Sequence, residues 1–316
     1  MNGSTVYGLS NEDYHHTAPY SDYLSSSQLK LYLKSPRHFR YMLENPEEEK
    51  SDALRFGSLF HMAIELYKKY GTIDAFYRAA AIFQPPVNER TGQPYGSTTK
   101  AYSEAYAQFL VDNKGKQIAT REEAALVDDM VGTLVRPSVG GDTARQVLKL
   151  LKWGESEVSH FIEYEGCKFK WRPDLETPRK IVDWKTVATD DLSEDGINRI
   201  ILKYGYHISA AFYQFFEHER SGIWKQFILV LVSKATPHDC VMVDMCNYGY
   251  RYYPEADIVN VGPGAMEFKK LLDLHIKCTK ENHWPGAEQA IPDNNGVRIL
   301  EIQPPRYYSN KFIELE

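Results

Sequence analysis

Two carboxylates and a lysine near the middle of the chain have the types and the spacing that phosphodiester hydrolysis requires. Asp174 follows Arg172-Pro173, and eight residues separate it from the triplet Asp183-Trp184-Lys185. Side chains alternate along a β-strand, so Asp183 and Lys185 are predicted to share a face while Trp184 points the other way. Asp174 comes alongside if the intervening residues make a hairpin-like return. Two converging carboxylates suit Mg²⁺ or Mn²⁺. A neighbouring lysine can orient or deprotonate the attacking water and offset charge on the phosphate.

The same triplet also has a purely structural interpretation. An Asp–Lys pair on a half-exposed strand is common and contributes only ~0–1 kcal/mol as a surface ion pair. Two local features favour a site instead. Asp183 follows Ile181-Val182, so it lies within an apolar strand where an unpaired charge is costly. Asp174 follows a proline, which fixes the chain immediately before it.

Two further segments supply candidate residues. His61 lies early in a predicted helix, where a lone histidine is usually a core or surface residue, so only a metal site elsewhere in the chain gives it a role. Tyr206, Tyr213 and Gln214 lie near one another at helical spacings after the predicted catalytic strand. That face could hydrogen-bond a DNA backbone or stack on a base, or it could pack under the sheet.

Composition limits the classes of protein to consider. Hydrophobic residues make up 43% and charged residues 25% of the chain, as in ordinary soluble globular proteins. The net charge of −6 argues against a nonspecific nucleic-acid coat protein but leaves room for an enzyme with a local basic channel. The four cysteines form no CxxC pair, which argues against a zinc or iron–sulfur site. The sequence has no apolar run of membrane length and no secretory signal at its start, so we expect a cytoplasmic protein.

The pattern of apolar and turn residues predicts a single domain over residues 1–316 with a helical front and an α/β core. We divide it into an irregular leader, a mainly helical portion, a catalytic core and a tail, at residues 1–24, 25–152, 153–284 and 285–316. The predicted helices cover residues 28–33, 54–70, 100–112, 120–135, 142–151, 200–220 and 266–280, with an exposed loop at 84–99. The predicted strands cover residues 157–164, 167–171, 180–184, 226–233 and 240–245. This order indicates an α/β fold with a mixed sheet and an N-terminal helical layer.

Taken in their order along the chain, these sequence motifs resemble those of the RecE-type exonucleases (exodeoxyribonuclease VIII), a family of the PD-(D/E)xK nuclease superfamily. The similarity runs from about Tyr14 to Arg306. No single motif is specific, and the resemblance rests on their order and spacing. The matching motifs are Tyr14-His15, Ser35-Pro36, Phe56 to His61, Arg172 to Asp174, Asp183 to Lys185, Tyr206 to Ile208 and Ala211 to Tyr213.

The resemblance implies a restriction-endonuclease-like fold, with a mixed central sheet flanked by helices, and a role for each motif. Mg²⁺, for which Mn²⁺ could substitute, would be bound by Asp174, Asp183, His61 and the backbone carbonyl of Trp184, with Glu157 as an additional acidic residue. Lys185 would act on the water. The predicted DNA contacts are Arg172, Tyr206, Tyr213 and Gln214.

The resemblance also implies an activity and partners. It predicts an exonuclease that acts on double-stranded DNA ends in the 5′-to-3′ direction, as a ring-shaped homo-oligomer beside a single-strand annealing protein in phage-type recombination, in a bacterial or phage-encoded setting. Ser209 stands where relatives carry a glutamine, which leaves open whether Gln214 replaces it. Ser35 stands where some superfamily members have a cluster-binding cysteine, so no iron–sulfur cluster is expected. An endonuclease or repair nuclease of the same fold, and a nuclease-like module that only binds DNA or protein, remain alternatives.

Overall fold

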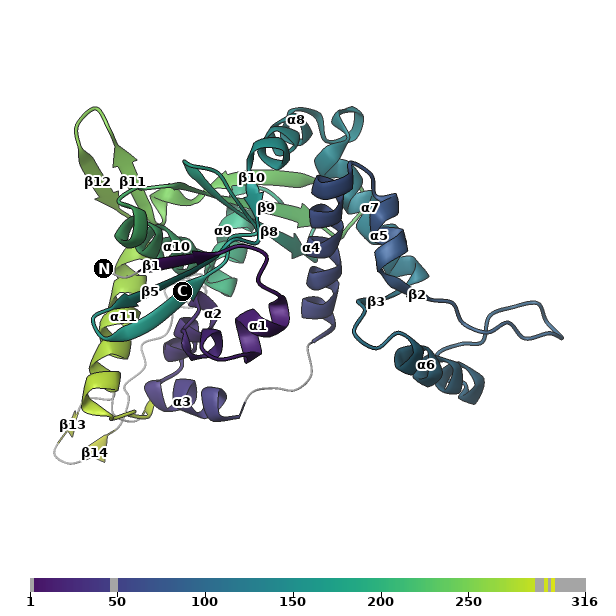
Figure 1. Ribbon diagram of the computed structural model, residues 1–316, viewed down its shortest axis with the longest axis horizontal. Helices are drawn as coiled ribbons and strands as arrows, with labels where there is room; N and C mark the ends of the chain where they lie inside the picture. Colours follow the sequence, from purple (N-terminus) through teal and green to yellow (C-terminus); the bar gives the residue numbers. More distant parts are fainter. Residues whose placement is uncertain (1–2, 46–50, 288–292, 295–296, 299–316) are drawn as a thin grey trace, which may run out of the picture.

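A five-stranded mixed sheet lies at the centre of the fold. The computed structural model describes residues 3–45, 51–287, 293–294 and 297–298. The strand order is β10-β9-β8-β7-β4, in which β8 and β9 run parallel and the other neighbours antiparallel. These strands are β4 (Glu155–Ser156), β7 (Leu175–Glu176), β8 (Lys180–Val187), β9 (Gln226–Ser233) and β10 (Cys240–Asp244). The predicted mixed sheet is therefore confirmed (Figure 1).

Alternation along β8 sends its side chains into two different layers. Val182 and Trp184 pack in one apolar cluster with the helices α4, α7 and α8, whereas Ile181 and Val187 pack in another with α9 and α10. These helices are α4 (Asp52–Tyr70), α7 (Arg121–Val135), α8 (Pro137–Trp153), α9 (Glu194–Tyr204) and α10 (Tyr206–Ser221). The sheet is thus covered by helices on both faces, and this also confirms the predicted helical layer.

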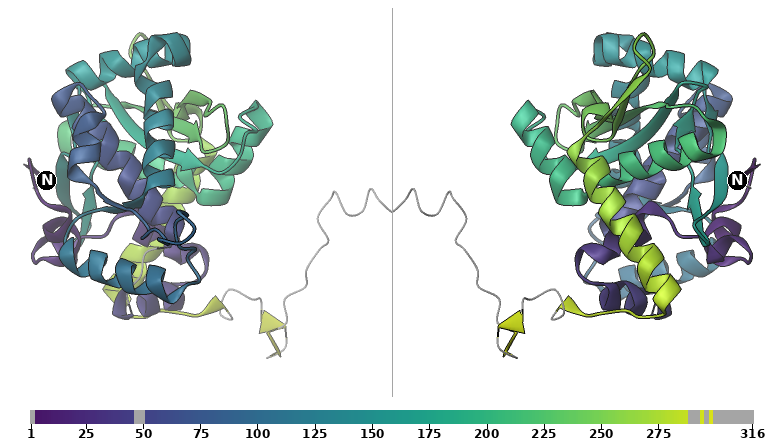
Figure 2. Two further views of the ribbon diagram at one scale, coloured as in Figure 1. Left: turned by 90° about the vertical axis from the view of Figure 1, so that its right-hand side faces the viewer. Right: turned by 90° about the vertical axis from the view of Figure 1, so that its left-hand side faces the viewer.

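A second, three-stranded antiparallel sheet supports the first. Its order is β1-β5-β6, and it packs with α10 and α11 around a separate apolar cluster. The elements are β1 (Gly3–Val6), β5 (Ser159–Tyr164), β6 (Cys167–Trp171) and α11 (Pro263–Glu281). Figure 2 shows α4 and α11 on opposite sides of the molecule.

The remaining described elements are short or lie at the periphery. In Figure 1, α6 and the loop before it extend away from the sheets. The helical elements are α1 (Asn11–His16), η1 (Tyr20–Asp22), α2 (Ser26–Leu29), η2 (Lys30–Leu33), α3 (Pro36–Glu44), α5 (Asp74–Ala79), α6 (Lys100–Asp112) and η3 (Met245–Asn247). The strands are β2 (Ala81–Phe83), β3 (Ile118–Thr120), β11 (Tyr250–Tyr253), β12 (Ile258–Val261), β13 (Asp293–Asn294) and β14 (Val297–Arg298). Across the described ranges, no helix is both long and apolar enough to cross a membrane.

Three predictions about elements were wrong. The leader at residues 1–24 is not irregular, because β1 pairs with β5 and α1 and η1 follow it. The predicted helix at 200–220 is two helices, because Gly205 takes a left-handed conformation (φ 64°) between them. The strand predicted from residue 157 begins at Ser159, since Glu157 has a φ of 54° in the turn before it.

Gln214 was predicted to contact DNA, but it is a core residue. It is fully buried on α10. Its amide nitrogen donates to the carbonyls of Lys225 (3.0 Å) and Tyr250 (2.8 Å), and its oxygen accepts from the Tyr250 N–H (2.9 Å). Gln214 therefore joins α10 to the start of β9 and to β11, and its amide is not available to a ligand.

Replacing Gln214 by leucine should destabilise the fold while nearly preserving side-chain volume. The change leaves the backbone groups of Lys225 and Tyr250 buried without partners, so we expect the free energy of unfolding to fall by about 3 kcal/mol. Urea denaturation would measure this loss. Gln108→Leu, on an exposed face of α6, is the matched control and should change stability by less than about 0.5 kcal/mol. Equal stabilities of the two variants would contradict the role given to Gln214.

Candidate active site

The candidate site forms where β8 extends beyond its shorter neighbour. β7 pairs with β8 only at Ile181 and Val182, so in the described part of the chain no strand covers the same edge at Trp184. The carboxylate of Asp174, immediately before β7, accepts the Trp184 N–H at 2.6 Å. A side chain thus replaces the missing strand at this edge, and Asp174 lies next to the triplet Asp183-Trp184-Lys185 as predicted.

Asp183 and Lys185 lie on the same face of β8. The Lys185 Nζ lies 2.8 Å from Asp183 Oδ2, 4.0 Å from Asp174 Oδ2 and 3.2 Å from the carbonyl oxygen of Trp184, to which it donates. Both carboxylate side chains are only 13% exposed. This pair is therefore not an exposed surface ion pair, and the purely structural interpretation of the triplet loses its main support.

His61 reaches the site from α4. Phe60 and Ala63 bury the helix against the sheet, and this packing directs the imidazole to the edge of β8. Its Nε2 lies 2.9 Å from the carbonyl oxygen of Trp184, to which it can only donate, and its Nδ1 lies 3.2 Å from Asp174 Oδ1. Burial opposes protonation of this ring, but the adjacent Asp174 outweighs burial and raises its pKa.

Glu157 completes the acidic group from an unexpected position. Its left-handed backbone in the turn before β5 places its carboxylate within 4.8 Å of the ligand atoms of His61 and Asp174. Burial and the negative charge of Asp174 raise the pKa of Glu157 to about 7. Arg172 Nη1 lies 3.7 Å from this carboxylate, and a bound cation would further favour its ionised form.

Burial and neighbouring charges shift the pKa values of Asp174, Asp183 and Lys185 in different directions. Burial alone would raise the pKa of Asp174, but His61 and Lys185 lower it to about 2. Burial would likewise lower the pKa of Lys185, yet Asp183 and Asp174 raise it above its ordinary value. For Asp183, burial and the nearby Asp174 outweigh Lys185 and raise the pKa. Lys185 is consequently an ammonium group at neutral pH in this arrangement.

These residues fit a divalent cation. Carboxylate oxygens, a backbone carbonyl and one imidazole are donors that Mg²⁺ or Mn²⁺ accepts. His61, Glu157 and Asp174 have ligand atoms close enough together to share an ion, and the Trp184 carbonyl lies beside His61. Asp183 lies outside that closest group, and one of its two carboxylate oxygens, Oδ2, faces Lys185.

Comparison with known proteins agrees with this geometry. Residues 25–290 match the family described as "PDDEXK-like domain of unknown function (DUF3799)". The chain belongs to the PDDEXK-like family. A crystal structure from Eubacterium rectale, described as a "Putative exonuclease", is similar with a TM-score of 0.52 and 17% sequence identity, over 96% of this chain and 97% of that chain. At this identity the similarity shows a shared fold, and the predicted PD-(D/E)xK fold is confirmed. A search of curated proteins gives no match.

Two predicted DNA contacts of this PDDEXK-like chain are engaged inside the protein instead. The guanidinium of Arg172 is 9% exposed, donates to Ser159 Oγ and Asn11 Oδ1 at 2.8 Å each, and lies 4.0 Å from the ring centroid of Tyr14. The Tyr213 hydroxyl donates to the Arg172 carbonyl at 3.2 Å. We therefore correct both assignments: Arg172 fixes the leader near Glu157, and Tyr213 holds the segment that leads to Asp174.

A second group of ligand-type side chains is an ion-pair network rather than a metal site. His160, Glu176 and Glu217 are buried with ligand atoms within 4.8 Å of one another. Lys225 Nζ lies 2.8 Å from Glu176 and 3.0 Å from Glu217, and Arg220 pairs with Glu217 at 2.7 Å. Burial would raise the pKa of Glu176, but His160 and Lys225 lower it to about 2. These carboxylates already have their cations.

Asp174→Asn should greatly weaken metal binding by the PDDEXK-like site. Asparagine can still accept the Trp184 N–H but removes a charged oxygen ligand. Loss of a group behind a metal ligand already costs 10–100-fold in affinity, so we expect loss of the ligand to cost more than roughly 100-fold. Electron paramagnetic resonance of free Mn²⁺ measures this. Asp273→Asn, on the exposed side of α11, is the control and should leave Mn²⁺ affinity unchanged. Equal affinity of the two variants would remove Asp174 from the metal site.

Proposed function

We propose that this protein is a divalent-metal-dependent deoxyribonuclease. The observation that carries the proposal is the convergence of Asp174, Asp183, Lys185 and His61 around the backbone of Trp184. Both Asp174 and Asp183 are only 13% exposed, and buried charges in proteins are paired or bind metal ions. A site of this kind is suited to a metal ion and a phosphodiester.

In the proposed reaction, each side chain has a distinct task. Asp174, Asp183, Glu157, His61 and the Trp184 carbonyl would hold Mg²⁺ or Mn²⁺, which supplies Lewis acidity toward phosphate and acidifies water. Lys185, an ammonium at neutral pH, would donate hydrogen bonds to the attacking water and to a phosphate oxygen, so its role would be to orient the water and offset negative charge.

We further propose the RecE-type exonuclease activity that the order of motifs implies. The substrate would be double-stranded DNA ends, degraded in the 5′-to-3′ direction by a ring-shaped homo-oligomer that works with a single-strand annealing protein in phage-type recombination. The enzyme would act on DNA in the cytoplasm of a bacterium. Supporting this choice are the motif resemblance and a structural neighbour over nearly the full chain whose name contains the word exonuclease.

Lys185→Ala should slow digestion of linear duplex DNA in Mg²⁺ by roughly 10²–10³-fold, the size of effect expected when one positioned hydrogen-bond donor to developing negative charge is removed. Release of nucleotides from an end-labelled duplex measures the rate. Lys269→Ala removes the same charge from an exposed site on α11 and should digest DNA like the wild type.

Three outcomes would contradict parts of this proposal. Equal digestion by the wild type and Lys185→Ala would remove the lysine from the mechanism. Cleavage of covalently closed circular DNA would favour an endonuclease of the same fold, because an end-dependent enzyme leaves that substrate intact. No cleavage by the wild type in Mg²⁺ or Mn²⁺, together with DNA binding, would favour a module that only binds DNA.

A further inference from the structure

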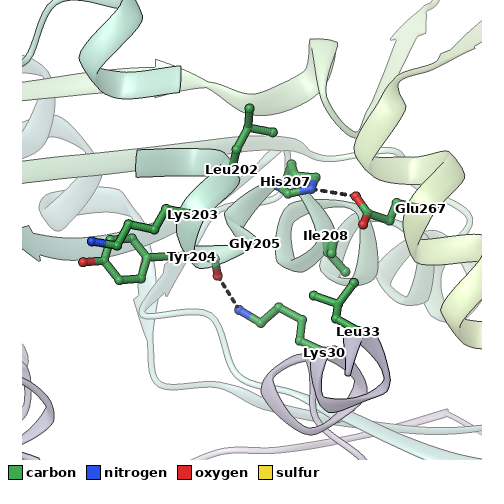
Figure 3. Close-up of a pocket in the computed structure, with 9 residues that line it drawn as sticks. All are labelled: Lys30, Leu33, Leu202, Lys203, Tyr204, Gly205, His207, Ile208 and Glu267. Carbon is green, nitrogen blue, oxygen red and sulfur yellow. Dashed lines mark hydrogen bonds and ion pairs between the residues drawn. The ribbon is translucent and has the colours of Figure 1, made fainter. Parts of the chain in front are cut away.

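A surface pocket lies at the junction of α9, α10 and η2. It has a volume of about 360 Å³, within the usual range of ligand pockets. Lys30, Lys203 and Tyr204 line one side, and His207 and Glu267 line the other (Figure 3). No residue of the proposed metal site lines it, so its chemistry requires a separate explanation.

Two tyrosines form an aromatic pair at this pocket because of Gly205. Residues two apart in a continuous helix point in nearly opposite directions. Gly205 instead has a φ of 64°, ends α9 and begins α10, so the rings of Tyr204 and Tyr206 stack with centroids 5.6 Å apart and planes at 26°. Tyr204 is 49% exposed, which leaves aromatic surface accessible beside a partner ring.

Positive charge surrounds the aromatic pair. Lys203 Nζ lies 5.2 Å from the ring centroid of Tyr204. Lys30 Nζ donates to the Tyr204 carbonyl at 3.1 Å and lies 5.9 Å from the ring centroid of Tyr206 (Figure 3). The carboxylate that lines the pocket, Glu267, lies on the opposite side, 2.9 Å from His207 Nε2. The charges next to the aromatic pair are therefore those of the two lysines.

The pocket is electrostatically continuous with the candidate active site. Burial raises the pKa of the Tyr206 hydroxyl to about 12, and the charges of Lys185 and Asp183 also act on it. Burial lowers the pKa of Lys30 to about 8, and Lys185 lowers it further. Lys30 and Tyr206, which are both affected by the charge of Lys185, also contact Tyr204: Lys30 through a hydrogen bond to its carbonyl and Tyr206 through ring stacking.

We propose that this pocket binds an unpaired nucleotide of the substrate strand, a role that rests on the proposed nuclease function. The nucleobase stacks on the exposed face of Tyr204, and the flanking phosphates lie near Lys203 and Lys30. Stacking of bases on aromatic side chains next to a basic track is the general way in which proteins bind single strands without reading their sequence. The subsite would keep a strand end unpaired beside Lys185.

The test compares binding of two single-stranded DNA oligonucleotides of equal length, one with bases and one abasic, by fluorescence anisotropy in EDTA at fixed salt. Tyr204→Ala should weaken binding of the base-containing strand about tenfold and leave binding of the abasic strand unchanged. Tyr204→Phe, which keeps the ring, should bind like the wild type. Lys203→Gln should weaken binding of both strands equally, because both carry the same phosphates.

Tyr70→Ala is a closely matched control. Tyr70 ends α4, is 57% exposed and has Lys69 Nζ 5.2 Å from its ring centroid, as Tyr204 has Lys203, but it does not line the pocket. This variant should bind both strands like the wild type. Circular dichroism melting verifies that each variant is folded.

The outcomes separate this subsite from the proposed function. Equal binding of the base-containing strand by the wild type and Tyr204→Ala would overturn the subsite, as would an equal loss on the abasic strand. If the wild type still digests duplex DNA in Mg²⁺, the nuclease proposal stands in either case. A wild type that neither binds single strands nor digests duplex DNA would overturn both.

Discussion

The candidate site depends on one backbone constraint: β8 is longer than β7, and the peptide groups at its uncovered edge need other partners. Backbone groups left without a strand are costly when buried and must be satisfied by side chains or water. At Trp184 the N–H is satisfied by Asp174, and the carbonyl by His61 and Lys185. One residue's two backbone groups therefore gather three of the side chains to which we assign the chemistry.

Buried charges beside the candidate site determine where this edge begins. Glu176, the last residue of β7, accepts hydrogen bonds from His160 on the second sheet and from Lys225 before β9. Removing one partner of a buried ion pair leaves the other uncompensated, typically at a cost of about 3–5 kcal/mol. The network therefore fixes β7, and with it Asp174, which lies two residues before Glu176. A paired set of buried charges therefore holds one carboxylate of the candidate site in place.

Local patterns in the sequence were sufficient for the triplet and for most regular elements, whose residues repeat with the period of a strand or helix. Asp183 and Lys185 share a face because of that period alone. The failures concern long-range partners. Nothing near Arg172 or Gln214 in the sequence reveals that their polar groups bind the leader and the start of β9, and a polar residue on a helix face was therefore assigned to DNA. The leader was considered irregular because β1 is stabilised by β5, more than 150 residues away.

The net charge of the chain does not predict the local charge around Lys30 and Lys185. The chain carries −6 overall, yet Lys30 and Lys185 lie close enough for the charge of Lys185 to lower the pKa of Lys30. Two cations that repel each other are stabilised by an anion between them, and a nucleic acid strand carries a negative charge at every nucleotide. The carboxylates of the metal site account for part of the negative total, and they would be offset by the ion. An acidic overall composition is therefore compatible with the nucleic-acid site that we propose.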